Sequence, residues 1–89
     1  MASVDFSPNI SSQVDVGKST VKASTIKAAL LELFESNPKL KSYLVNDDGT
    51  LRKHVAIVVD GVPVKDRANQ SDSISEKSEI FIMQALSGG

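Results

Sequence analysis

The sequence predicts an α+β domain in which a mixed sheet of four to five strands packs on one main helix. Three observations predict it: an amphipathic helix pattern covers residues 24–37, alternating apolar strands lie on both sides of it, and 89 residues suffice for one domain only. The apolar fraction of 40% and the charged fraction of 24% are those of an ordinary globular protein.

Two strands are expected before the helix. Val4 and Phe6 alternate with polar residues, and Pro8 ends this first strand because proline cannot donate to a sheet ladder. SPNISSQVDVG (residues 7–17) is interpreted as a polar connection. GKSTVK (residues 17–22) is expected to return as the second strand.

The helix gives the clearest signal. Its apolar residues recur at i, i+3, i+4, i+7 and i+8, which puts on one face Ile26, Ala29, Leu30, Leu33 and Phe34. Ser24 or Thr25 is expected to cap the first turn through a side-chain oxygen. Asn37-Pro38 is expected to end the helix, because a residue before proline is pushed out of the helical region. Apolar residues at 40–44 indicate a short further turn of helix.

The remaining strands follow the helix. NDDG (46–49) is typical of a turn, and residues 55–59 are apolar on both faces, as expected of a central strand. Asp60-Gly61 predicts a tight turn, and Pro63 makes the next short strand an edge strand. The final strand is expected at Glu79–Ala85.

This order of elements predicts the β-grasp arrangement. One long helix must cover one face of a mixed sheet, with the first and last strands adjacent in the middle. The C-terminus would then leave a central strand and point into solvent. We expect a β-grasp domain over residues 1–85 and a flexible Gly-Gly tail over residues 86–89.

Composition argues against several classes of function. A net charge of −1 disfavours nucleic-acid binding, and the sequence has neither a signal-peptide pattern nor an apolar run that could cross a membrane, so a cytoplasmic location is expected. Without cysteine, and with His54 as the single histidine, no metal site or catalytic residue is predicted. We therefore expect neither an enzyme nor a bound cofactor, and a monomer when the protein is free.

The predicted sheet has an apolar face without a helix. If Ile80 and Ile82 point toward the helix, alternation places on the opposite face Ala56, Val58, Phe81 and Met83, which we call the docking face. An exposed apolar patch of this kind usually marks a protein partner. Arg52 and Lys53 flank it and could steer an acidic partner. A homodimer contact or partial covering by a loop is the alternative.

The sequence ends on Ser87-Gly88-Gly89. Two terminal glycines arise by chance in about one chain in 200 at average glycine usage. Without Cβ atoms they form a thin segment, and the four residues from Leu86 onward can reach roughly 13 Å into a partner's channel. A terminal carboxylate that another enzyme activates would need a thin, extended segment of this kind.

Taken together, these segments resemble the ubiquitin-like sulfur carriers. The family includes the small subunit of molybdopterin synthase, the thiamine-biosynthesis sulfur carrier and the carrier that feeds cysteine synthesis, which is the most similar kind. The resemblance rests on STIKAALLELFESNP, GTLRKHVAIVVDGVPV and ISEKSEIFIMQALSGG, in that order, and fits residues 8–20 loosely. Lys53 stands where arginine is common, Ala56 replaces a frequent asparagine, and Gln84-Ala85 replaces a common Pro-Ala.

The resemblance implies a function carried by Gly89. An ATP-dependent adenylating enzyme of the ubiquitin-activating type would bind the docking face and the tail of Leu86, Ser87, Gly88 and Gly89, and would adenylate the Gly89 carboxylate. A persulfide sulfur donor would convert it to a thiocarboxylate for an acceptor synthase, such as a cysteine synthase-like enzyme. The chain would be a carrier rather than an enzyme, and only its partner would use ATP.

Two other functions are compatible with the same features. A ubiquitin-like modifier would join Gly89 to a lysine through an isopeptide bond. A non-covalent β-grasp interaction module would use the docking face alone, with the glycines as a flexible end.

Overall fold

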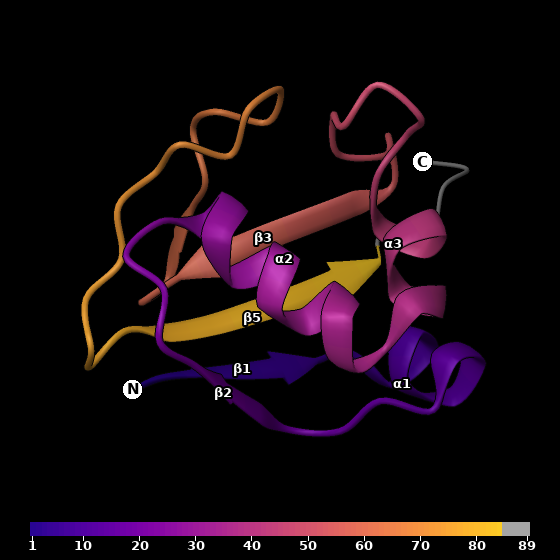
Figure 1. Cartoon of the computed structure of the whole chain (residues 1–89), viewed down its shortest axis with the longest axis horizontal. Coiled ribbons are helices and arrows are strands. Elements are labelled where there is room, and N and C mark those ends of the chain that lie inside the picture. Colours follow the sequence, from indigo (N-terminus) through magenta and orange to yellow (C-terminus); the bar gives the residue numbers. More distant parts are fainter. Residues whose placement is uncertain (85–89) are drawn as a thin grey trace.

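The computed structural model describes residues 1–84 of the chain (Figure 1). Its strands are β1 (Ala2–Phe6), β2 (Ser19–Val21), β3 (Val55–Val59), β4 (Val62–Pro63) and β5 (Glu79–Gln84), and its helices are α1 (Pro8–Val14), α2 (Ile26–Ser36) and α3 (Pro38–Leu44). The end of the last strand, predicted at Ala85, and the predicted tail of residues 86–89 lie outside the described residues.

The five strands form one mixed sheet in the order β2-β1-β5-β3-β4. β5 lies in the middle, parallel to β1 and antiparallel to β3. The first and last strands are therefore adjacent, as predicted. β4 is a two-residue edge strand that contains Pro63, again as predicted. The fold is the ubiquitin-like β-grasp.

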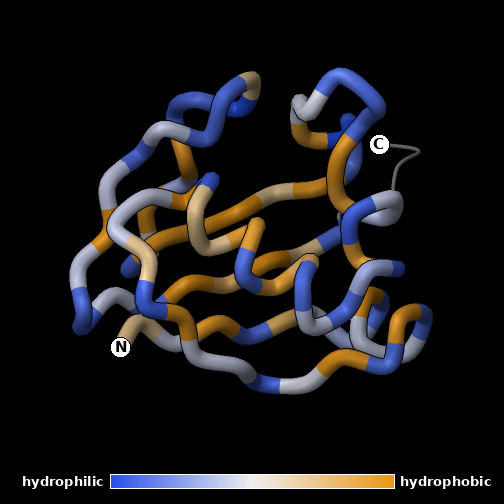
Figure 2. The backbone as a smooth tube through the Cα atoms, viewed as in Figure 1, coloured by the Kyte–Doolittle hydropathy of each residue, from blue (hydrophilic) through white to orange (hydrophobic). Residues whose placement is uncertain are grey.

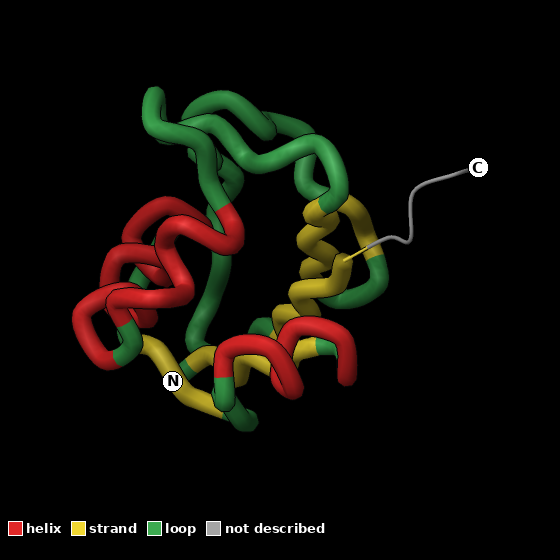
Figure 3. Tube along the Cα trace, turned by 90° about the vertical axis from the view of Figure 1, so that its right-hand side faces the viewer, coloured by secondary structure: helices red, strands yellow, loops and turns green. Residues whose placement is uncertain are grey.

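Helix α2 packs across one face of this sheet (Figures 1 and 3). It begins after Thr25, whose Oγ1 accepts a 3.2 Å hydrogen bond from the Ala28 N–H, so Thr25 is the cap. The buried side chains of the helix are Ile26, Ala29, Leu30 and Leu33, and Phe34 is half-buried at the margin. The predicted apolar stripe is confirmed.

Helix α1 corrects the interpretation of residues 7–17 as a polar connection. Pro8 occupies the first turn, where its missing N–H costs nothing. Ile10 and Val14, four residues apart, are both buried, and Asp15 ends the helix in the left-handed region at φ 59°. Val14 therefore ends this helix, and Val16 follows it outside any strand.

Helix α3 is longer than the short turn predicted at residues 40–44. Pro38 not only ends α2 but also begins α3, because proline at the first helical position has a suitable φ and needs no donor. Leu40 and Leu44 are completely buried. They anchor α3 beside α2 and at the end of the sheet.

The core lies between the helices and one face of the sheet. β3 is apolar throughout, and Figure 2 shows it as an unbroken hydrophobic band between hydrophilic loops. The inward side chains of the two central strands, Val55, Ile57, Ile80 and Ile82, are all buried. Alternation then sends the residues between them to the other face.

Candidate functional site

The four residues of the docking face lie together on one face of the sheet. Phe81 of β5 pairs with Val58 of β3, and Met83 pairs with Ala56, so these four side chains share one face in two neighbouring rows. Phe81 is 36% exposed and the other three are half-buried. The face lies on the side of the sheet away from α2 (Figure 3).

The structure extends this face beyond the four predicted residues. On one side, Pro63 of β4 pairs with Val58, and on the other, Asp5 of β1 pairs with Phe81. One row thus crosses four strands, apolar over three of them and acidic at β1. Local sequence does not show which residues pair across separate strands. Asp5 and Pro63 were therefore not predicted as members of this face.

Arg52 lies at the end of the sheet where β5 finishes. Its backbone is fixed, because its N–H donates to the Leu44 carbonyl at 2.9 Å and its carbonyl accepts from Arg67 Nη2 at 2.9 Å. Arg52 lines a hollow of about 220 Å³ together with Tyr43, His54 and Gln84. Arg52 therefore lies close to Gln84, the last described residue of β5.

Lys53 is exposed in the turn before β3. It does not line that hollow. Of the two predicted flanking cations, the structure brings only Arg52 to the place where β5 ends.

Gln84, the last described residue, is held by one hydrogen bond to its side chain and another from its backbone. Its Oε1 accepts a 2.5 Å hydrogen bond from the Tyr43 hydroxyl, and its N–H donates to Ser7 Oγ at 3.3 Å. It lies between the Arg52 hollow and a second hollow of about 270 Å³ lined also by Asn9 of α1. The predicted tail residues Leu86, Ser87, Gly88 and Gly89 are outside the described part of the chain.

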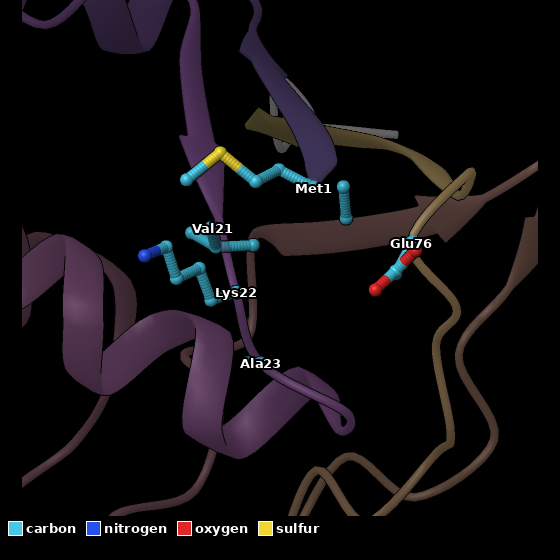
Figure 4. A pocket seen from close by; sticks show the side chains of 6 residues that line it. Met1, Val21, Lys22, Ala23 and Glu76 are labelled. Atoms are coloured by element: carbon cyan, nitrogen blue, oxygen red, sulfur yellow. The ribbon is translucent and has the colours of Figure 1, made fainter.

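Another hollow, of about 210 Å³, lies at the opposite end of the sheet (Figure 4). It is lined by Met1, Ala2, Val21, Lys22, Ala23 and Glu76. Lys22 and Glu76 lie on different sides of it (Figure 4). It is near the start of β5, about 17 Å in strand length from Gln84, and so is separate from the place where the tail begins.

The carboxylates with lowered pKa values accept hydrogen bonds within loops and do not belong to the docking face. The pKa of Asp48 is lowered because the Thr50 hydroxyl and N–H donate to it, as expected of the predicted turn. The pKa of Asp66 is lowered by the Ser71 hydroxyl and the Asn69 N–H. Within residues 1–84, no group of three or more histidine or carboxylate residues could hold a metal ion, and no helix is long and apolar enough to cross a membrane.

Solved structures share this fold along the whole chain. One is a chain of the Amycolatopsis orientalis BexX/CysO complex, with 14% identity, complete coverage of both chains and a TM-score of 0.84. CysO from Mycobacterium tuberculosis is 16% identical over 97% of this chain and 100% of its own, with a TM-score of 0.82. SAMP1 from Haloferax volcanii is 20% identical over 99% and 98%, with a TM-score of 0.79. At these identities the likeness shows the fold.

The sequence itself matches the family model described as the ThiS family over residues 16–89. No curated protein matches. The matched span begins just before β2 and runs through the docking face to Gly89. The chain therefore belongs to the ThiS family, the ubiquitin-like sulfur carriers that its sequence resembles.

Proposed function

We propose that this protein is a cytoplasmic sulfur carrier whose Gly89 carboxylate is adenylated by a partner enzyme and then converted to a thiocarboxylate. The sulfur would pass to an acceptor synthase in cysteine or cofactor biosynthesis. The observation that carries the proposal is the family match over residues 16–89, which extends through the Gly88-Gly89 pair. The chain would act as the substrate of its partners, without a catalytic residue or a bound cofactor of its own.

The proposed chemistry needs little from the chain beyond its terminus. The Gly89 carboxylate attacks the α-phosphate of ATP and releases pyrophosphate, and a persulfide from the donor then displaces AMP. The resulting acyl disulfide is cleaved by a second thiol, which leaves the thiocarboxylate and a disulfide. The chain contains no cysteine, so the donor system must supply that thiol and the carried sulfur rests on Gly89.

The docking face suits this role because of where it lies. Met83 belongs to it and directly precedes Gln84, so a partner seated on the face would lie next to the start of the tail. Arg52, beside Gln84, would attract an acidic channel entrance. The face would provide binding free energy, while the terminal glycines would pass through a narrow channel.

A related fold has been solved with a second protein, as the name BexX/CysO complex states. By analogy, we expect a ubiquitin-activating-type adenylating enzyme, a sulfur donor and an acceptor synthase to use this chain in turn. Neither nucleic acid nor a membrane is expected as a partner.

Adenylation by the activating enzyme of the same organism tests the proposal. ATP–pyrophosphate exchange should depend on the carrier and should be abolished when Gly88 and Gly89 are deleted. Phe81→Ser should raise the KM for the carrier, because it removes apolar contact area while the tail stays intact, whereas Lys77→Ala on a distant loop should have no effect. Exchange that persists without the two glycines would refute Gly89 as the activated group.

A second candidate function is protein modification. One solved neighbour is named a small archaeal modifier protein, so the same fold occurs in a protein with that name. A modifier would leave branched Gly-Gly remnants on lysines of other proteins, whereas a sulfur carrier need not. A non-covalent module would retain its function after deletion of Gly88 and Gly89.

A further inference from the structure

Helix α2 carries a second exposed surface, on the side of the molecule opposite the docking face. Lys27, Leu31 and Glu35 follow one another at four-residue spacing, so they form one stripe along the helix. All three are exposed, and Leu31 is 54% exposed although it is a large apolar residue. The stripe is thus a cation, an apolar centre and an anion, in that order.

An apolar hollow lies beside this stripe. It has a volume of about 170 Å³, and its lining includes Leu30, Phe34 and Val45, the two cations Lys27 and Lys41, and Leu31 itself, which stands at its edge toward the stripe. A space of this size accepts one leucine side chain or one aromatic ring, since an engineered cavity of about 150 Å³ binds benzene. The hollow therefore fits a single apolar side chain next to a positive rim.

The charges on α2 do not suit the helix itself. Lys27 lies in the first turn and Glu35 near the end, whereas the helix macrodipole favours acidic residues at the start and basic residues at the end. The first turn contains no acidic residue and the last turn no basic one. A second helix running antiparallel would place its own Glu35 next to Lys27 and its own Lys27 next to Glu35.

We propose that two copies of this chain associate through α2, antiparallel about a two-fold axis that passes close to Leu31. The Lys27-Leu31-Glu35 stripe is self-complementary under that symmetry: two ion pairs form, one on each side of the axis. Leu31 of each copy enters the apolar hollow of the other. The stripe supplies the plug and both charges, and the hollow is formed largely by neighbouring residues of the same copy, among them Leu30, Phe34 and Val45.

The proposed dimer is weak and leaves the sulfur-carrier surfaces accessible. One helix pair buries less area than the roughly 1,200 Å² at the lower limit of stable interfaces, so the dimer is expected to form only at high chain concentration. A weak dimer of this kind is compatible with the sequence-based expectation of a monomer at low concentration. Because α2 lies on the other side of the sheet (Figure 3), both docking faces of the dimer remain free for partner enzymes.

Sedimentation equilibrium of the full-length protein, from 10 µM to about 1 mM chain, tests the proposal. Lys27→Glu and Glu35→Lys should each weaken the dimer by about tenfold, because one substitution changes two symmetry-related pairs. The combined Lys27→Glu/Glu35→Lys variant should restore wild-type association, since the pairs re-form with exchanged charges. Lys77→Glu and Glu76→Lys change the net charge equally on a distant loop, so they should leave association unchanged.

Leu31→Ser should abolish association while circular dichroism shows the native fold. A wild-type chain that stays monomeric up to about 1 mM would overturn the proposal, as would a folded double variant that does not dimerise. Deletion of Gly88 and Gly89 should not affect the dimer. Failure of this proposal is therefore distinct from failure of the sulfur-carrier proposal.

Discussion

The Tyr43 hydroxyl on α3 donates a 2.5 Å hydrogen bond to Oε1 of Gln84, the last described residue of β5. The two residues are 41 positions apart in the sequence. Together with the Ser7 hydroxyl, which accepts from the Gln84 N–H, Tyr43 fixes the end of the strand from which the tail departs.

Tyr43→Phe removes this bond and should lower the free energy of unfolding by about 1 kcal/mol, the usual net value of one hydrogen bond. The end of β5 should open more readily, so the Gln84 amide should exchange faster. Urea denaturation and native-state hydrogen exchange measure the two effects. Unchanged exchange at Gln84 would show that Tyr43 does not restrain the strand end.

Phe81 and Ile82 are neighbours on β5 that point to opposite faces. Ile82→Ala should cost about 2–5 kcal/mol because it leaves a cavity in the buried core. Phe81→Ala should cost clearly less, since Phe81 is partly exposed on the docking face. Chemical denaturation of both variants compares them, and equal losses would contradict the assignment of faces.

Asp72 stabilises the loop before β5 through two backbone hydrogen bonds, from the Lys65 N–H at 3.0 Å and the Asp66 N–H at 2.9 Å. These donors hold the pKa of Asp72 below its ordinary value of 3.8. The stability that they provide is therefore complete above that value and is lost as the pH falls through the lower pKa of the folded state.

Asp72→Asn should lower stability at neutral pH and should flatten the loss of stability on acidification between about pH 5 and pH 2. Thermal unfolding across that range measures the slope. Glu76 is an exposed carboxylate in the same connection between β4 and β5, so Glu76→Gln controls for the loss of one negative charge. A steeper acid dependence in Asp72→Asn would contradict this assignment.

Thr25 caps α2, so Thr25→Ala should cost about 1 kcal/mol of stability, the typical value for losing an N-cap oxygen. Thr25→Ser keeps that oxygen and should therefore retain most of the stability that the cap provides. Denaturation midpoints of the two variants measure this. Serine has the hydroxyl without the methyl group, so equal losses in Thr25→Ser and Thr25→Ala would show that the methyl group, and not the cap, stabilises the helix.

The elements with strong periodicity could be predicted from the sequence. The stripe of α2 and the alternation in β3 and β5 gave the sheet, the helix and the docking face, because period 3.6 and period 2 are direct consequences of side-chain direction. Pairing of β1 with β5 then followed from the order of the elements. These predictions needed no knowledge of distant contacts.

What could not be predicted depends on tertiary contacts. α1 offers only Ile10 and Val14 as buried residues in an otherwise polar stretch, and seven residues are too few for a clear helical period. A proline after Ser7 and two apolar residues four apart were the available signals. The Tyr43–Gln84 bond and the row from Asp5 to Pro63 join distant segments, so nothing local predicts them.

The central claim is that sulfur is carried on Gly89, and intact-mass analysis of thiol alkylation tests it most directly on protein purified from its own host. The chain has no cysteine, so an alkylatable sulfur can only be a thiocarboxylate, and methionine oxidation adds nearly the mass of sulfur exchange but does not alkylate. We predict one alkyl group, mapped to Gly89. A chain that remains unalkylated in the presence of its adenylating enzyme, ATP and the sulfur donor would contradict the account.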